Sequence, residues 1–298
     1  MERKFLNYFW IFLKGMAMGI ADIIPGVSGG TIAFITGIYE ELISSLNEIK
    51  FSLIKDLKNG GIKLVSSKIN IPFLICLFSG IILSVLLFSN FISWLLIEHP
   101  IQIWSFFFGL IISSIFYVIK KIEKWNLLTA LMLIIGIIIA YRITKLEVLS
   151  SHDSYIYLFT SGAIAICAMI LPGISGAFIL VIMGSYGSVL QAINDKEIYK
   201  IMAFGLGAIF GLMTFSKLLK FLFKEFKNET LAILIGFMAG ALVKIWPWKK
   251  NTEKLLEECV SPLAYEGDPK LFQAINLILI GFLLIFIFDY LANKKVIE

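Results

Sequence analysis

The glycine- and serine-rich segment at residues 25–31 has the residue types best suited to bind an anion. It reads Pro-Gly-Val-Ser-Gly-Gly-Thr, and a close copy at residues 172–178 follows 147 positions later. Proline and glycine end a helix, and a serine caps the next one, whose first N–H groups then lie at the positive end of the helix dipole. Helix starts of this kind bind phosphate and other anions. We therefore predict one anion site built from both segments, with these residues: Pro25, Gly26, Ser28, Gly29, Gly30, Thr31, Gly173, Ser175 and Gly176.

A purely structural role is the alternative for both segments, which would then only turn the chain and allow close packing. Glycine and proline are frequent in membrane helices, so a single break carries little information. Two matching breaks in corresponding positions of two halves point more specifically to a binding site. We keep both interpretations at this stage.

Four charged residues in or beside apolar segments are candidate partners of the anion: Lys14, Asp22, Lys244 and Glu40. Charges in such segments are costly and are therefore candidates for function. Lys14 and Lys244 have the right sign, although Lys244 precedes the aromatic residues 245–248 and would equally serve as an interfacial anchor. Asp22 would repel a phosphate, which suggests proton binding, a salt bridge to Lys14 or orientation of the hairpin. Glu40 is expected near water at a helix end.

The inventory for enzymatic chemistry is poor. Cys76, Cys167 and Cys259 are far apart, and His99 and His152 are isolated, so no metal-ligand spacing or catalytic base is evident. We predict no catalytic residues, no metal and no cofactor, while leaving open coupling to protons or sodium. The lysines cluster between apolar segments without aromatic interleaving, which argues against a nucleic-acid partner.

Composition places the chain in a membrane. Of its 298 residues 59% are hydrophobic and only 16% charged, with a mean hydropathy of +0.90. These values exclude an ordinary soluble protein, and the apolar runs are too long for barrel strands. The first run continues into the first glycine-rich segment without a small-residue cleavage pattern, so we do not expect a cleaved signal peptide. The sequence predicts an all-α polytopic membrane protein.

The apolar runs predict two repeats, each with a broken or re-entrant helical hairpin and three transmembrane helices. The first repeat, residues 1–148, has a hairpin at 5–46 with helices at 5–24 and 28–46, and spans at 71–97, 101–119 and 126–142. The second repeat, residues 149–298, has a hairpin at 155–192 with helices at 155–171 and 175–192, and spans at 199–223, 229–248 and 271–292. Each repeat crosses the membrane an odd number of times, so the second is inverted relative to the first.

Glycines outside the two segments align in the same order in both halves. The aligned pairs are Gly15 with Gly162, Gly37 with Gly184, Gly80 with Gly207, Gly109 with Gly236, and Gly136 with Gly281. Each pair alone is weak evidence, because apolar helices resemble one another. Their common order supports a duplication.

The distribution of basic residues predicts the orientation. With both termini in the cytoplasm, the cytoplasmic segments hold about twice as many lysines and arginines as the external ones, in agreement with the positive-inside rule. The lysine-rich residues 47–70 would lie on anionic lipid or form a solvated loop, and residues 249–270 would form an acidic external loop.

The chain also resembles a known family, the bacterial polyprenyl-phosphate transporters called PopT, long labelled a domain of unknown function. The resemblance covers nearly the whole chain and rests on these residues: Lys14-Gly15, Met18-Gly19, Ala21-Asp22, residues 25–31, Gly37-Ile38-Tyr39-Glu40, residues 172–176 and Ile245-Trp246-Pro247-Trp248. It implies a flippase of the bacterial cytoplasmic (inner) membrane that moves undecaprenyl phosphate from the outer to the inner leaflet. This lipid transport recycles the carrier used for peptidoglycan and other steps of cell envelope biogenesis.

The mechanism that the resemblance implies agrees with the residues. The isoprenoid tail stays in lipid while the phosphate, held at facing helix N-termini, crosses by alternating access of the inverted halves. The expected partners are a polyprenyl-phosphate lipid and membrane lipids, and a homodimer is compatible with the sequence. An inorganic-anion channel or exchanger is the alternative function, because broken helices with glycine and serine ends also suit small anions.

Overall fold

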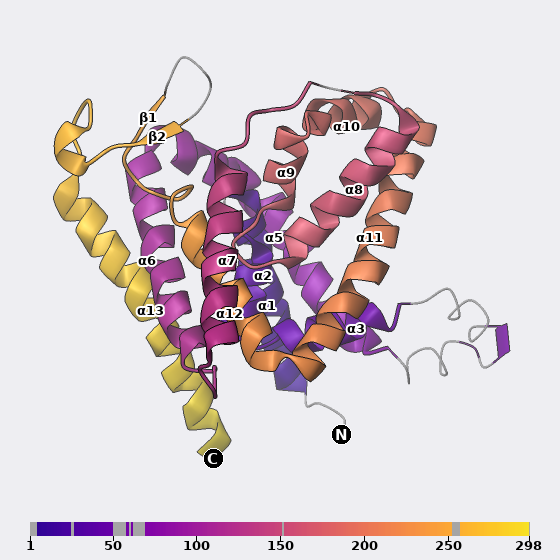
Figure 1. Ribbon diagram of the computed structural model, residues 1–298, viewed down its shortest axis with the longest axis horizontal. Coiled ribbons are helices and arrows are strands. Elements are labelled where there is room, and N and C mark those ends of the chain that lie inside the picture. Colours follow the sequence, from indigo (N-terminus) through magenta and orange to yellow (C-terminus); the bar gives the residue numbers. More distant parts are fainter. Residues whose placement is uncertain are drawn as a thin grey trace. The chain divides into compact units, whose positions relative to one another are not determined.

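The computed structural model describes residues 5–24, 27–49, 58–59, 61, 69–150, 152–251 and 257–297. Pro25 and Gly26 of the predicted anion site lie outside the described residues, as does most of the lysine-rich stretch 47–70. Within the described part the regular structure is helical apart from one pair of short strands (Figure 1). This confirms the predicted all-α class.

The helices follow one another in the same order in the two halves of the chain. The first half contains α1 (Phe5–Ile23), α2 (Gly29–Ile35), α3 (Tyr39–Asn47), α5 (Ile71–Glu98), α6 (Pro100–Ile119) and α7 (Leu127–Thr144). The second half contains α8 (Tyr155–Ile170), α9 (Gly176–Ile182), α10 (Ser185–Asn194), α11 (Ile198–Glu225), α12 (Lys227–Ala241), the antiparallel strands β1 (Lys249–Asn251) and β2 (Glu257–Cys259), the 3₁₀ helix η1 (Pro262–Ala264) and α13 (Leu271–Ile297).

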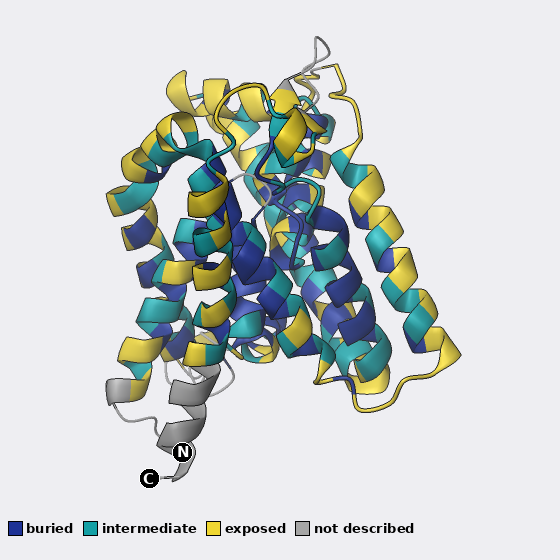
Figure 2. Cartoon of the chain, turned by 90° about the vertical axis from the view of Figure 1, so that its left-hand side faces the viewer, coloured by how far each residue is buried: buried dark blue, intermediate teal, exposed yellow. Residues whose placement is uncertain are grey.

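Four of the described helices, α5, α6, α7 and α11, are long and apolar enough to cross a membrane. The pair α9 and α10, bent by 105° at its break, would make a fifth span or a re-entrant loop. Exposed residues recur along the outer faces of the helices (Figure 2), and on α5 they include Leu86 at 73% and Ile97 at 74% exposure. Apolar side chains exposed over whole helices would be unfavourable in water, so these faces contact lipid.

The chain forms two compact units, each with helices from both halves of the sequence. The first unit comprises Met1–Leu87, Val148–Leu171 and Ser175–Phe226. It contains the helices on either side of both glycine-rich segments. The second unit comprises Phe88–Glu147, Pro172–Ile174 and Lys227–Glu298. These units interleave in the sequence, so the predicted division into repeats at residue 148 stays a prediction.

In the first unit, glycines bring equivalent helices into backbone contact. A Cβ atom added to Gly80 of α5 would collide with the Phe12 carbonyl oxygen of α1. One added to Gly207 of α11 would collide with the Phe159 carbonyl oxygen of α8. Phe12 and Phe159 are 147 positions apart, the same offset as the two glycine-rich segments. The contact of α1 with α5 is therefore repeated by α8 with α11.

In the second unit, glycines also bring helices into backbone contact, but here each contact joins a helix of the first half to a helix of the second half. Four glycines approach a backbone carbonyl of the neighbouring helix: Gly109 at Ile278, Gly236 at Leu133, Gly136 at Ile233 and Gly281 at Phe106. Helix α6 thus packs on α13, and α12 packs on α7. Under the sequence alignment α6 corresponds to α12 and α13 to α7, so one pair reproduces the other. Each pair joins a helix of one half to a helix of the other half.

The prediction of one continuous helix for the second arm of each hairpin was wrong. Helix α2 ends at Ile35 and α9 ends at Ile182, and a second short helix follows each. Gly37, with φ of 74°, and Gly184, with φ of 65°, adopt the left-handed conformation between them. Glycine adopts the left-handed conformation at little cost, and a residue in this conformation ends an α-helix. Both arms are broken at aligned glycines.

The span predicted at 229–248 was too long at its C-terminal end. Helix α12 stops at Ala241, and turns lead to strand β1. The Trp246 indole donates to the Val260 carbonyl at 2.9 Å, and the Trp248 indole donates to the Pro269 carbonyl at 2.9 Å. These two side chains therefore hold the connection between α12 and α13 rather than continue the helix.

The close contact at Gly207 leads to a stability prediction. Gly207→Ala should destabilise the protein by roughly 1–3 kcal/mol, because the new methyl group meets backbone and forces α8 and α11 apart. Gly205→Ala is the matched control on the same helix, since a Cβ atom there meets nothing within 4 Å. Thermal unfolding in detergent should show a lower Tm for Gly207→Ala alone. Equal Tm values for the two variants would contradict the packing described here.

Candidate functional site

The first glycine-rich segment starts α2 with a capped and closed turn. Ser28 is fully buried and serves as the N-cap, with its Oγ accepting from the Gly30 N–H at 3.1 Å. The Gly29 N–H donates to Asp22 Oδ1 at 2.7 Å, and the Thr31 N–H donates to the Ser28 carbonyl at 2.9 Å. The first three N–H groups of α2 thus have acceptors in the protein. The Asp22 bond supports orientation of the hairpin, one of the three roles predicted for it, which stays a prediction.

The first segment contacts the C-terminal end of α8. The Ser28 hydroxyl lies 3.2 Å from the carbonyl oxygens of both Met169 and Leu171, and it can donate to either. A Cβ atom on Gly30 would lie 2.5 Å from the Ile170 carbonyl oxygen, so only glycine allows this approach. The start of α2 therefore sits on the carbonyl end of α8, immediately before the second segment begins at Pro172.

The second segment starts α9 with a more open turn. Ser175 is the N-cap, and its Oγ accepts from the Phe178 N–H at 3.4 Å. Among the residues that the structure describes, the N–H groups of Gly176 and Ala177 have no acceptor. The position that corresponds to Asp22 is occupied by Met169, which has no carboxylate. The two copies therefore differ: a carboxylate closes the start of α2 and none closes the start of α9.

The predicted cationic and acidic partners take other positions. The Lys14 ammonium donates to the Thr36 carbonyl at 2.7 Å. Thr36 is the C-cap of α2, so this bond holds the lysine at the opposite end of α2 from Ser28. A cation at a helix C-terminus is favourable. Glu40 is exposed in the first turn of α3, close to the predicted position near water.

Two other predicted site residues belong to the second unit. Gly173 has φ of 85°, and a Cβ atom there would lie 2.8 Å from the Met238 backbone, so the loop packs closely on α12. Lys244 is half-buried in the turn after α12. No group of three or more histidine, cysteine, aspartate or glutamate residues that could hold a metal ion occurs in the described part of the chain.

Sequence reasoning missed the difference between the two copies. The contacts of Ser28 with the Met169 and Leu171 carbonyls involve backbone atoms, which residue types do not reveal. The replacement of Asp22 by Met169 at the aligned position was visible in the sequence and was the available signal.

These features define the class of protein. The protein has apolar helices long enough to span a membrane, and two aligned helix breaks after which a serine caps the next helix. Both features are typical of helical membrane transporters with discontinuous helices.

The comparisons with known proteins identify the family. This chain belongs to the VCA0040-like family, described as undecaprenyl phosphate translocase-like, whose model matches residues 18–261. It is 47% identical over 276 residues to a polyprenyl-phosphate transporter of Vibrio cholerae, covering 89% of this chain and 90% of the relative. It is 36% identical over 264 residues to a polyprenyl-phosphate transporter of Staphylococcus aureus, covering 81% and 87%. Both relatives are named as transporters, in agreement with the non-enzymatic prediction. No solved structure shows a significant match.

The bond between Asp22 and Gly29 leads to a second prediction. Asp22→Ala should lower the free energy of unfolding by about 1–2 kcal/mol, because the buried Gly29 N–H loses its acceptor. Asp22→Asn keeps an oxygen acceptor and should restore most of that stability. Thermal unfolding in detergent measures both variants. If Asp22→Asn is as unstable as Asp22→Ala, the charge and not the acceptor supports the turn.

Proposed function

We propose that this protein translocates a polyprenyl phosphate, most simply undecaprenyl phosphate, from the outer to the inner leaflet of a bacterial cytoplasmic membrane. The names of the two relatives and the description of the family support the substrate class. The observation that supports the phosphate-binding role is the pair of serine-capped helix starts at Ser28 and Ser175, with Ser28 in contact with Leu171, four residues before Ser175.

The energetic problem of such a transporter is the phosphate group. The isoprenoid tail is apolar and remains in lipid throughout. An unpaired phosphate charge in hydrocarbon would cost on the order of ten or more kcal/mol, so the protein must replace its hydration shell. Backbone N–H groups at a helix start and serine hydroxyls are suited to this, because they donate hydrogen bonds without adding a competing charge.

In the proposed cycle the phosphate first binds at the open start of α9. The N–H groups of Gly176 and Ala177, with the Ser175 hydroxyl, are the available donors. The start of α2 joins the site when the Asp22 carboxylate leaves Gly29. Binding of a proton or a sodium ion by Asp22 would favour that release and would couple an ion to transport.

We also propose a duplicated architecture, alternating access and cytoplasmic termini. The matching glycine contacts of α1 with α5 and of α8 with α11, and those of α6 with α13 and of α12 with α7, support a duplicated architecture. Rocking of inverted halves about the phosphate would give access to one leaflet at a time. The lysine distribution supports cytoplasmic N- and C-termini.

The experiment measures transport of labelled undecaprenyl phosphate in proteoliposomes, with chloride and phosphate flux recorded in the same preparation. Lipid movement without anion flux is expected. Anion flux without lipid movement would favour the alternative of an inorganic-anion channel or exchanger, for which the open N–H groups of α9 are also suited.

A charge placed at the open helix start tests the site itself. Ala177→Asp should reduce lipid translocation at least tenfold, because the new carboxylate repels the phosphate and competes for the same N–H groups. The protein should stay folded, since Ala177 is exposed and an aspartate in the first turn stabilises a helix. Ala177→Asn is the neutral control of similar size and should retain most activity. Normal translocation by a well-folded Ala177→Asp protein would exclude this site.

A further inference from the structure

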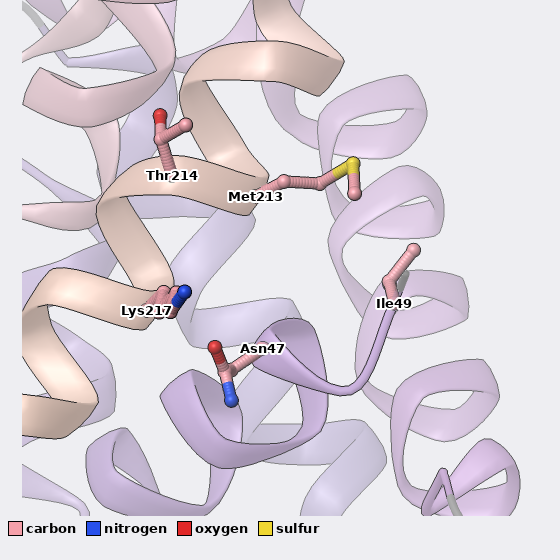
Figure 3. A pocket seen from close by; sticks show the side chains of 5 residues that line it. All are labelled: Asn47, Ile49, Met213, Thr214 and Lys217. Atoms are coloured by element: carbon pink, nitrogen blue, oxygen red, sulfur yellow. The ribbon is translucent and has the colours of Figure 1, made fainter. Parts of the chain in front are cut away.

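A cavity of about 400 Å³ lies in the first unit, between the end of α3 and helix α11 (Figure 3). It is lined by Asn47 and Ile49 at the end of α3 and by Met213, Thr214 and Lys217 of α11. These residues join one amide, one hydroxyl and one ammonium group to two apolar side chains. The volume is in the range of pockets that hold small ligands.

The cavity lies beside the C-terminal half of α11, a helix long enough to span a membrane. Lys217 is eight residues before Glu225, where α11 ends, which corresponds to about 12 Å along the helix axis. Charged residues at such a position in an apolar helix are costly and indicate function. Lys217 is exposed in this structure, so its ammonium group is accessible from the cavity.

The two polar groups best placed to bind a ligand have no partner in the described part of the chain. Asn47 is only 9% exposed, and no hydrogen bond of its amide to a described residue is found. Lys217 forms no ion pair with any described residue. In Figure 3 the polar ends of both side chains are turned to the same space. The Asn47 amide lines the cavity, so its N–H groups can donate hydrogen bonds to a ligand there.

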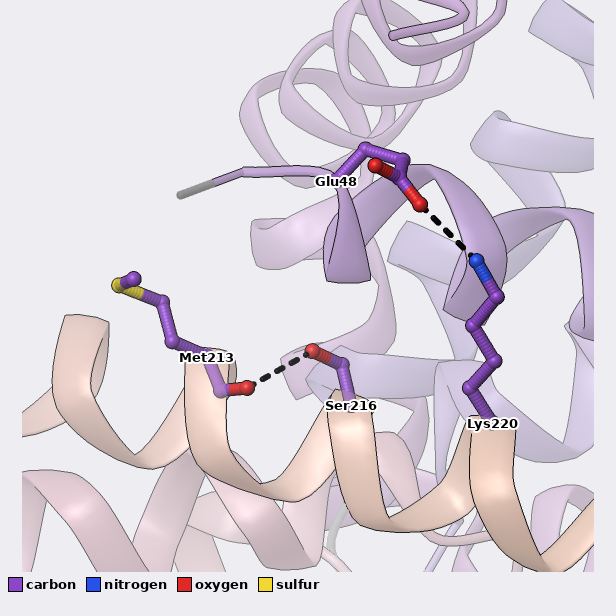
Figure 4. A network of polar contacts seen from close by, with 4 residues as sticks. All are labelled: Glu48, Met213, Ser216 and Lys220. Carbon is purple, nitrogen blue, oxygen red and sulfur yellow. Dashed lines mark hydrogen bonds and ion pairs between the residues drawn. The ribbon is translucent and has the colours of Figure 1, made fainter. Parts of the chain in front are cut away.

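The neighbouring lysines of α11 behave differently. Lys220 pairs with Glu48 at 2.9 Å, and Lys224 pairs with Glu225 at 3.1 Å (Figure 4 shows the first pair). The Glu48 carboxylate is therefore paired with Lys220, and Lys217 forms no ion pair among the described residues. The cavity keeps net positive charge and selects an anion.

The apolar side chains indicate what kind of anion fits. Ile49 and Met213 line the cavity beside the polar groups, and both are half-buried. The Thr214 hydroxyl donates to the Phe210 and Gly211 carbonyls, so its oxygen is left to accept a hydrogen bond. A phosphate group with an attached apolar chain can accept from Lys217 and Asn47 and contact Ile49 and Met213, whereas a free inorganic anion leaves Ile49 and Met213 without a partner. The Thr214 hydroxyl is not a donor to this phosphate, because its proton is already donated to a carbonyl of its own helix.

We propose that the α3–α11 cavity is a second phosphate-binding station for the transported lipid, in which Lys217 and Asn47 hold the phosphate while Ile49 and Met213 contact the first carbons of the chain. This rests on the proposed function, because it takes the polyprenyl phosphate as the ligand. The station is separate from Ser28 and Ser175, and Lys217 supplies the full positive charge that the two helix starts lack.

Photocrosslinking tests occupancy of the cavity in the full-length purified protein. A photoreactive benzoylphenylalanine replaces Ile49, and a control protein carries it in place of Leu86, an exposed residue of α5 that does not line the cavity. Radiolabelled undecaprenyl phosphate should label the first protein several-fold more than the second. Excess unlabelled undecaprenyl phosphate should remove this labelling, whereas undecaprenol, which has no phosphate, should not.

Charge variants in the same proteins test the residues. Lys217→Gln should weaken the labelling at position 49 about tenfold, the loss expected for one charge-assisted hydrogen bond. Asn47→Leu should also weaken it, because leucine has a similar size but no N–H group to donate to the phosphate. Lys224→Gln removes the same charge from the same helix outside the cavity and should have no effect. Equal effects of Lys217→Gln and Lys224→Gln would overturn the proposal.

Competing ligands and transport separate the remaining outcomes. Competition by phosphatidylglycerol as strong as that by undecaprenyl phosphate would assign the cavity to membrane phospholipid, and competition by inorganic phosphate alone would assign it to a free anion. Either result would overturn a station for the substrate while leaving the proposed function intact. Specific labelling in a protein that fails to translocate the lipid would instead contradict the proposed function and keep the phosphate site.

Discussion

A helix broken in an apolar environment leaves backbone N–H and C=O groups without water, and this constraint governs the first unit. At the start of α2 the donors are satisfied by Asp22 and Ser28, and the Ser28 hydroxyl in turn reaches the carbonyl end of α8. The serine at the first break thus gives a hydrogen-bond donor to the free carbonyl groups at the second break. The arrangement also brings the positive end of α2 against the negative end of α8, which is favourable for both helix dipoles.

Close helix packing is the second requirement, and glycine meets it at equivalent places. Gly80 and Gly207 let backbones touch in the first unit, and four further glycines do so in the second unit. Without a hydrophobic driving force between helices in lipid, van der Waals contact at small residues contributes much of their association. The exchange of partners, with α6 on α13 and α12 on α7, ties the two halves of the sequence together within one unit. The two halves of the sequence therefore do not form two independent units.

The two glycine-rich segments differ in the side chain that faces the start of the following helix. Asp22 occupies the start of α2, while Met169 stands at the aligned position and leaves the N–H groups of Gly176 and Ala177 without a described acceptor. A symmetric pair of anion sites is therefore not what this structure contains. In the proposed function the open start of α9 binds the anion first, and at the start of α2 an anion must replace the Asp22 carboxylate. In the same unit, Lys217 and Asn47 line the cavity that we propose as a second phosphate station.

The sequence by itself determined the membrane class, the helix breaks, the serine caps and the aligned glycines, because hydropathy, proline and glycine act locally on the backbone. It also placed the family through residues such as Lys14, Asp22 and those of the two segments. Only the tertiary structure decided which groups meet. The Ser28 contact with the Leu171 carbonyl, the attachment of Lys14 to the far end of α2, the second break at Gly37 and the cavity between α3 and α11 depend on backbone atoms and on residues distant in sequence. The distances between these groups cannot be derived from residue type and spacing, because they depend on how the helices pack.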